Sequence, residues 1–165
     1  MANARFVASL AIAQALVCGG ALGAAEANAT GTGSTDRITV RLAASRYNSG
    51  ESGVAVLVPA GSETMMTIQI SGVPDYTSRP IHLTAEVFGG ACGSRSQEAI
   101  YAPSGPSLAH SLIRPAAIGA LRGPSRIAHR LPVPFEELRT TPFAISVRLR
   151  PADGNVEIFC GDRAT

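Results

Sequence analysis

The chain has 165 residues, of which 45% are hydrophobic and only 5% aromatic, and its formal net charge is +2. All fourteen basic residues are arginine, and acidic residues are interspersed among them, so no basic block or basic–aromatic pattern supports nucleic-acid binding. Once an amino-terminal leader is set aside, the remaining length fits one domain.

The amino terminus has the pattern of a signal peptide. Arg5 supplies a positive charge, and residues 6–17 form an apolar stretch that is too short to cross a membrane as a helix. Candidate cleavage sites, which require small residues, lie at Ala25, Ala27 and Ala29. The pattern predicts a signal peptide over residues 1–27 and export to the periplasm or the cell exterior.

Cys18 raises the alternative of a bacterial lipoprotein, because it ends the apolar stretch and is followed by glycine. Lipidation requires a small residue directly before the cysteine, and Val17 is not small. The sequence therefore favours cleavage by a signal peptidase over lipidation at Cys18. No later stretch is apolar over a length that could span a membrane.

A polar linker over residues 28–36 precedes alternating patterns that are typical of β-strands. Ile38, Val40 and Leu42 share one face of an extended segment, with polar residues between them. Turns rich in glycine, serine and proline separate this segment from the following ones. Further strands are predicted over the stretches 54–58, 66–70 and 81–88.

After Cys92 the alternation disappears. Proline and glycine interrupt residues 103–124, which we expect to form a long irregular loop. The exceptions are a short strand near 99–101 and a helical turn near 116–121. Periodicity then returns, and Pro151–Asn155 predicts a hairpin turn before the last strand. The later elements are strands over 127–133, 143–149 and 156–161 and a helical turn over 134–138.

About seven or eight short strands separated by glycine and proline turns predict an all-β fold, a Greek-key sandwich or barrel over residues 37–163. Two cysteines remain in this domain, Cys92 after an inner strand and Cys160 in the last strand. In an oxidising compartment such a pair usually forms a disulfide, which contributes about 4 kcal/mol on the chain-entropy model. Two unrelated buried thiols are the alternative.

A series of short motifs resembles the copper/zinc superoxide dismutase fold, and more closely its small exported bacterial relatives and chordin-type repeat domains. The motifs occur in the family's order across most of the domain, as Ser52–Leu57, Ser71–Pro74, Pro80–Thr84, Ala91–Gly93, Pro142–Arg148 and Ile158–Gly161. The resemblance implies a sandwich of the dismutase type. It also implies a disulfide between a loop cysteine and a Cys-Gly near the carboxyl end, here Cys92 and Cys160.

The resemblance further implies where a copper site would lie. His82 matches the first histidine of the family's His-x-His pair, but Thr84 replaces the second, and Arg148 replaces a histidine on the penultimate strand. Threonine is a poor copper ligand, and a guanidinium group does not coordinate metals. We therefore expect no cofactor. The alternative is a rearranged copper or zinc site formed by His82 with His110 and His129.

Strand parity places Arg148 on the same outer face as Glu86. We expect the guanidinium group to occupy the metal region and to form an ion pair with a carboxylate there, with Glu86 as the first choice. The histidines also have simpler structural interpretations. His82 would bond to backbone, His129 would be buried and hydrogen-bonded in the core, and His110 would be exposed.

No catalytic constellation accompanies this scaffold, because a nucleophile elbow is absent and the adjacent carboxylates Glu136 and Glu137 diverge on a helical turn. We therefore predict an exported, non-enzymatic domain with a binding or structural role. One alternative is a metal-binding or superoxide dismutase-type protein. Another is an accessory subunit of an exported assembly that contacts its partner through the apolar residues of the 103–124 loop, Leu108, Leu112, Ile113, Ile118 and Leu121.

Overall fold

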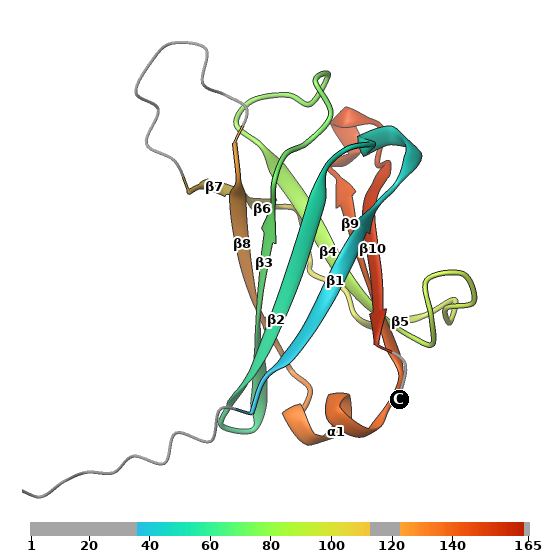
Figure 1. Ribbon diagram of the computed structural model, residues 1–165. Helices are drawn as coiled ribbons and strands as arrows, with labels where there is room; N and C mark the ends of the chain where they lie inside the picture. Colours follow the sequence, from blue (N-terminus) through green and yellow to red (C-terminus); the bar gives the residue numbers. More distant parts are fainter. Residues whose placement is uncertain (1–35, 113–122, 164–165) are drawn as a thin grey trace, which may run out of the picture. The chain divides into compact units, whose positions relative to one another are not determined.

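The computed structural model describes residues 36–112 and 123–163, all of which belong to one compact unit. Within these ranges the protein is almost entirely antiparallel β-structure, so the all-β prediction is confirmed. The strands form one sheet in the order β5-β4-β9-β10-β1-β2-β3-β8-β7, with β6 paired to β4. The sheet curls into a nearly closed barrel (Figure 1).

Seven strands of at least seven residues carry the described fold, and each overlaps a stretch where the sequence predicts a strand. In β1 the alternation of apolar and polar residues becomes an alternation of buried and exposed side chains, which fixes the face turned to the core. The seven strands are β1 (Ile38–Ala44), β2 (Ser52–Ala60), β3 (Glu63–Ile70), β4 (His82–Gly89), β8 (Ser125–Leu131), β9 (Phe143–Leu149) and β10 (Glu157–Arg163).

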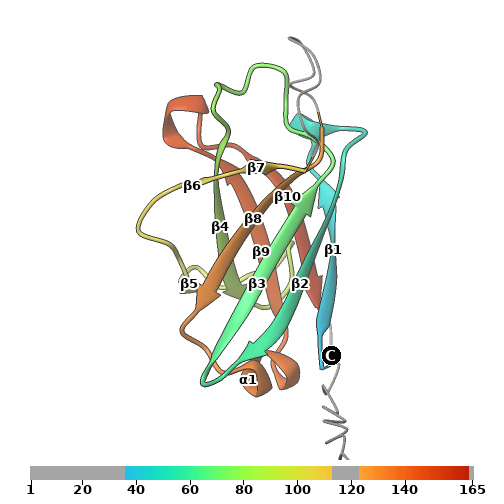
Figure 2. The same cartoon turned by 90° about the vertical axis from the view of Figure 1, so that its left-hand side faces the viewer.

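The predicted short strand near 99–101 is present as β5 (Ala99–Tyr101). Two further short strands correct the prediction that residues 103–124 form an irregular loop, namely β6 (Ser107–Leu108) and β7 (His110–Ser111). β6 pairs with β4 and β7 pairs with β8, so the segment crosses from one to the other and closes the barrel there (Figure 2). Two-residue bridges are too short to carry a periodic apolar pattern, which explains why the sequence did not indicate them.

Several predicted features fall outside the described residues. These are the signal peptide over 1–27, Cys18, most of the linker over 28–36 and the helical turn near 116–121. The apolar loop residues Ile113, Ile118 and Leu121 also lie there, whereas Leu108 and Leu112 are described and are 45% and 43% exposed.

The barrel interior is filled by aliphatic and aromatic side chains from the long strands. Leu57, Phe143 and Phe159 are among the fully buried ones. Helix α1 (Phe135–Thr140), which matches the predicted helical turn, buries Phe135 and Leu138 at one end of the barrel. The described residues include no helix with the length and apolar character that crossing a membrane requires.

Two 3₁₀ turns connect long strands, η1 (Arg46–Asn48) between β1 and β2 and η2 (Pro151–Asp153) between β9 and β10. The second is the predicted hairpin turn, and Gly154 follows it with a φ of +91°, a conformation that favours glycine. The Asp153 carboxylate accepts hydrogen bonds from the backbone N–H and hydroxyl of Ser78 and from the Arg150 guanidinium. These bonds tie the turn to the connection before β4, and the Ser78 bond chiefly lowers the pKa of Asp153.

β1 and β10 pair over a short distance only. Their ladder contains Ala43↔Cys160 and Ala44↔Phe159, whereas the ladder between β1 and β2 contains six pairs. Below this contact the two strands diverge, and α1 lies at the open end (Figure 1). Gly161 permits the close approach at the top, because a Cβ atom there would lie 2.2 Å from the Arg41 carbonyl oxygen.

Candidate functional site

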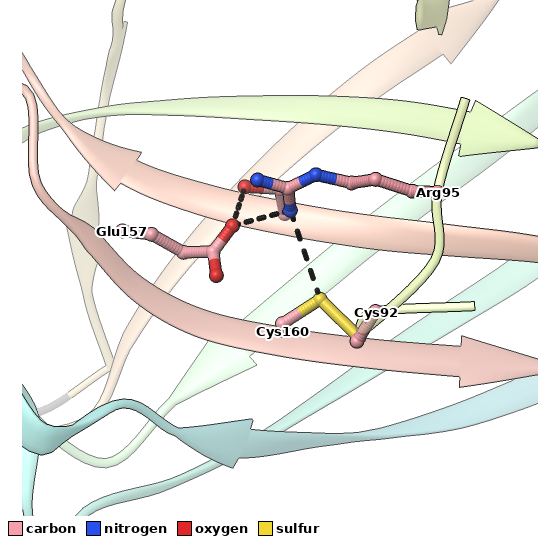
Figure 3. The surroundings of a disulfide bond; sticks show 5 residues. Cys92, Arg95, Glu157 and Cys160 are labelled. Atoms are coloured by element: carbon pink, nitrogen blue, oxygen red, sulfur yellow. Dashed lines mark hydrogen bonds and ion pairs between the residues drawn. A yellow bond between two sulfur atoms is a disulfide. The ribbon is translucent and has the colours of Figure 1, made fainter. Parts of the chain in front are cut away.

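A disulfide joins the loop after β4 to the last strand, as predicted. The Cα atoms of Cys92 and Cys160 are 6.0 Å apart, within the normal range for a disulfide. The loop from Gly90 is thereby held over the outer face of β4, β9 and β10 (Figure 3). This is the face on which the resemblance to the dismutases would place a copper site.

An ion pair next to the disulfide occupies part of this face. Arg95 Nη1 lies 2.5 Å from Glu157 Oε2, and the same oxygen accepts a hydrogen bond of 2.6 Å from the Ser146 hydroxyl. The Arg95 guanidinium also lies over the Phe88 ring, with 4.9 Å from its central carbon to the ring centroid, and its Nη1 is 4.0 Å from Cys160 Sγ. Arg95 thus fastens the loop to β10 beside the disulfide (Figure 3).

The predicted ion pair between Arg148 and Glu86 is wrong. In the β4–β9 ladder Arg148 faces Thr84, and Glu86 faces Ser146. The Arg148 guanidinium instead donates to the side-chain and backbone oxygens of Asn155, at 3.2 and 2.7 Å. The competing acceptor comes from the hairpin turn, where Asn155 has a φ of +50°, and this local geometry could not be inferred from strand parity.

The three histidines are distributed over different parts of the barrel. His82 Nδ1 lies 3.0 Å from the Pro80 carbonyl oxygen, as expected for a residue bonded to backbone, and His110 is exposed in β7. His129 faces the interior. The described residues contain no group of three or more His, Cys, Asp or Glu side chains placed to hold a metal ion. Together with Thr84 and Arg148, these donors do not fit a copper or zinc centre.

His129 is buried, as predicted, but only one of its ring nitrogens has a partner. Nδ1 lies 3.3 Å from the Tyr101 hydroxyl, while Nε2 has no hydrogen-bond partner among the described residues. Burial lowers the pKa of His129 and raises the pKa of Tyr101. Burial thus disfavours the protonated form of the imidazole.

A cleft that the sequence did not indicate opens where β1 and β10 diverge. It has a volume of about 460 Å³, and we call it the arginine cleft. Strands β1 and β10 form its sides and α1 lies at its end. Its lining consists of Asp36, Arg37, Ile38, Thr39, Val40, Arg41, Phe135, Arg139, Asp162 and Arg163.

The arginine cleft carries an excess of positive charge, with four arginines against two aspartates. Two of the arginines have internal partners. Arg163 donates to the carbonyl oxygens of Leu138 and Arg139, and Arg139 Nε lies 2.9 Å from a Glu136 carboxylate oxygen.

Arg37 and Arg41, in contrast, form no ion pair or side-chain hydrogen bond within the described part of the chain. Arg41 is exposed on the outer face of β1, and Arg37 is exposed directly before the strand begins. Their guanidinium groups are therefore available to an anion.

Two features of the sequence are related to this cleft, but neither of them predicts it. Arg37 and Arg41 are four residues apart on one strand face, which alternation makes visible. Gly161 in the last strand marks a close backbone approach. Neither signal shows that β10 leaves β1 below this point, because strand divergence is a property of the whole barrel.

No protein-family model matches this chain, and no curated protein matches it in sequence.

Proposed function

We propose that this protein is an exported, disulfide-stabilised β-barrel domain that acts by binding an anionic partner and not by catalysis. The observation that carries the proposal is the arginine cleft, in which Arg37 and Arg41 are exposed and have no acidic partner among the described residues. Arginine presents several N–H donors in a fixed fork, which suits carboxylate and phosphate groups.

Export to the periplasm or the cell exterior is part of this proposal. The amino-terminal pattern with Arg5 and the apolar stretch 6–17 supports it, and so does the pairing of Cys92 with Cys160, since disulfides persist in oxidising compartments. An accessory subunit of an exported assembly is a version of the same proposal, in which the anionic partner is another chain.

The proposal also includes a scaffold of the superoxide dismutase type without an intact copper site. The disulfide and the motif order support this scaffold. Thr84 and Arg148 face each other across β4 and β9, at the two positions where the resemblance would place metal ligands. A redox role would require a metal centre that this donor set does not favour.

Titration with succinate and with inorganic phosphate, followed by NMR at low ionic strength, tests anion binding. We expect the backbone amide signals of residues that line the cleft, such as Thr39 and Asp162, to shift in a saturable way, and the shifts to shrink as salt is added. The double variant Arg37→Ala/Arg41→Ala should lose this response. Arg126→Ala, an exposed arginine on β8, is the matched control and should keep it. Shifts that survive in the double variant would contradict the assignment of the site.

A further inference from the structure

We propose that the outer face of β2 and β3 is a docking surface for an amphipathic helix of a partner protein, whose apolar stripe has acidic residues on both sides. We call this surface the valine face and define it by Val54, Val56, Val58 and Met65. The inference rests on the proposed function, because Arg41 of the arginine cleft also borders the valine face. It names the class of anionic partner and adds a surface outside the cleft.

The first observation is that β2 is apolar on both of its faces. Ala55 and Leu57 are fully buried in the barrel interior, whereas Val54, Val56 and Val58 point outward and are half-buried. In β1 and β8 most of the outward side chains are exposed. A strand with water on one face alternates between apolar and polar residues, and a strand covered on both faces is apolar throughout. The pattern of β2 therefore indicates that its outer face is covered in a complex.

Within the described residues, no element lies over the middle of this face. The main contacts of β2 are with its neighbours β1 and β3 and with α1, which lies at the end of the barrel. Figure 2 shows the outer face of β2, β3 and β8 turned toward the viewer. Met65 of β3 lies directly opposite Val58 and is also half-buried, so the apolar surface extends over two strands.

The second observation is that an arginine borders the valine face on each side. Arg41 of β1 is paired with Val54 of β2. Gln69 of β3 lies between Val54 and Arg126 of β8. Three strand spacings, about 14 Å along the sheet, thus separate the two arginines. Both are exposed, and neither forms an ion pair or a side-chain hydrogen bond within the described part of the chain.

This spacing fits an α-helix. A helix with its side chains is about 10–12 Å in diameter, and helices pack on sheets as a second layer. A helix that lies along β2 and β3 would place its apolar stripe on the valine face. Acidic residues on the two sides of the stripe would then come within reach of Arg41 and Arg126.

A second copy of this chain does not fit the valine face. Packing two valine faces together by twofold symmetry would place arginines of one copy opposite arginines of the other. The helix α1, the only α-helix in the described residues, has six residues and buries its apolar side chains Phe135 and Leu138. Charge complementarity therefore selects a different chain with acidic residues.

A membrane surface is also disfavoured. Binding within the membrane interface requires large apolar side chains that enter the boundary between headgroups and acyl chains. The most exposed large apolar residues, Tyr47 and Tyr76, lie in turns outside the valine face, whose own side chains are half-buried.

Fluorescence anisotropy with defined peptides tests the proposal. The probe is a fluorescein-labelled helical peptide with leucine at every third or fourth position, glutamate on both sides of this stripe and alanine on the remaining face. One control peptide has lysine in place of glutamate. A second has the same composition as the probe in a scrambled order without a stripe. The full-length exported protein is the binding partner.

Matched variants separate the apolar and charged contributions. Val56 lies between Thr39 and Thr67, so Val56→Thr suits its surroundings but reduces the apolar surface, and it should weaken binding of the probe about fivefold. Val56→Ile should remain within about twofold of the parent. Arg126→Ala should weaken binding about threefold, whereas Arg148→Ala on the outer face of β9 should stay within about twofold.

The outcomes distinguish this inference from the proposed function. Weaker binding in Val56→Thr and Arg126→Ala, with no binding of the two control peptides, supports the docked helix. Equal binding of the probe and the scrambled peptide, or no binding of the probe while succinate and phosphate still bind, would overturn the docked helix and leave anion binding by the arginine cleft intact. Binding to phosphatidylglycerol vesicles in place of the probe, weakened by Val56→Thr, would overturn it in favour of a membrane. If neither the probe nor succinate nor phosphate binds, the proposed function fails as well. Circular dichroism and thermal unfolding of each variant establish that it is folded.

Discussion

Arg95 and Glu157 are 62 residues apart in the chain, yet their charged groups lie 2.5 Å apart beside the Cys92–Cys160 disulfide. Both side chains are largely shielded from solvent, with 27% and 28% exposure. The covalent bond and the ion pair thus hold the same loop against β10, one next to the other. Removal of either partner would leave the other charge poorly solvated.

The first prediction concerns this ion pair. Arg95→Ala should lower the free energy of unfolding by about 1–3 kcal/mol, because Glu157 keeps its burial but loses its charged partner. Urea denaturation with the disulfide intact measures the change. Arg130→Ala is the matched control, since Arg130 pairs with Glu63 at 3.3 Å in an exposed position. Its effect should stay below about 1 kcal/mol. Equal losses of stability in the two variants would show that the Arg95–Glu157 pair stabilises the fold no more than the exposed Arg130–Glu63 pair does.

The same face shows how far the sequence could predict the site. The disulfide could be predicted, because exported domains with two cysteines usually pair them. The predicted ion pair of this face was that of Arg148 with Glu86, whereas Arg148 bonds to Asn155 and the pair present is Arg95 with Glu157. Arg95 lies in a stretch without strand periodicity, so no parity argument could place it over Glu157. The register shift in β10 between Glu157 and Phe159 likewise has no sequence signature.

A second prediction follows from the buried imidazole. Burial lowers the pKa of His129 below its ordinary value of 6.5, so the folded protein binds a proton more weakly than the unfolded chain does. Unfolding therefore takes up a proton at acidic pH, and the stability is lost progressively as the pH falls below 6.5. The melting temperature should therefore fall as the pH is lowered from neutral to mildly acidic values.

His129→Leu separates this effect from general acid sensitivity. Leucine fills a similar volume and does not titrate, so the fall in melting temperature below the ordinary histidine pKa should become shallower. His110→Ala, which removes an exposed histidine, should keep the parental slope. An unchanged slope in His129→Leu would assign the acid sensitivity to other groups.

A third prediction concerns the contact that limits the arginine cleft. In Gly161→Ala the added Cβ would lie 2.2 Å from the Arg41 carbonyl oxygen and 2.8 Å from Leu42 Cδ2, so the two strands must separate. We expect a loss of about 1–3 kcal/mol in urea denaturation, as for other overpacked sites. Gly93→Ala meets no atom within 4 Å and should change stability by less than about 0.5 kcal/mol. A neutral Gly161→Ala would mean that the strands separate at no cost.

The sequence predicts the strands of the barrel but does not predict the cleft. Ile38, Val40 and Leu42 identify β1 because each buried side chain is separated from the next by one exposed residue. Pairing between β1 and β10, in contrast, depends on side chains and turns more than one hundred residues apart. Its early end at Ala43↔Cys160, and therefore the cleft, is a non-local outcome of barrel closure.

The last prediction tests whether the outer face of β4 and β9 has the geometry of a dismutase-type copper site. Thr84 and Arg148 are direct partners in the β4–β9 ladder, and His82 lies two residues before Thr84 on the same face. Directly opposed side chains have Cβ atoms about 4.5–5.5 Å apart, and side chains two residues apart along a strand are separated by roughly 7 Å. Three imidazoles at these positions could reach one metal ion, and His82 would retain Nε2 for it, since Nδ1 contacts Pro80.

The double variant Thr84→His/Arg148→His should therefore bind copper(II) close to one ion per chain in equilibrium dialysis. Its electron paramagnetic resonance spectrum should show nitrogen ligands. The single variants are the controls, because each leaves either threonine or a cationic guanidinium in the ligand set and should bind much more weakly. A double variant that binds no more copper than the parent would show that this face does not have the geometry of a dismutase copper site. The inferred scaffold would then be supported by the disulfide and the motif order alone.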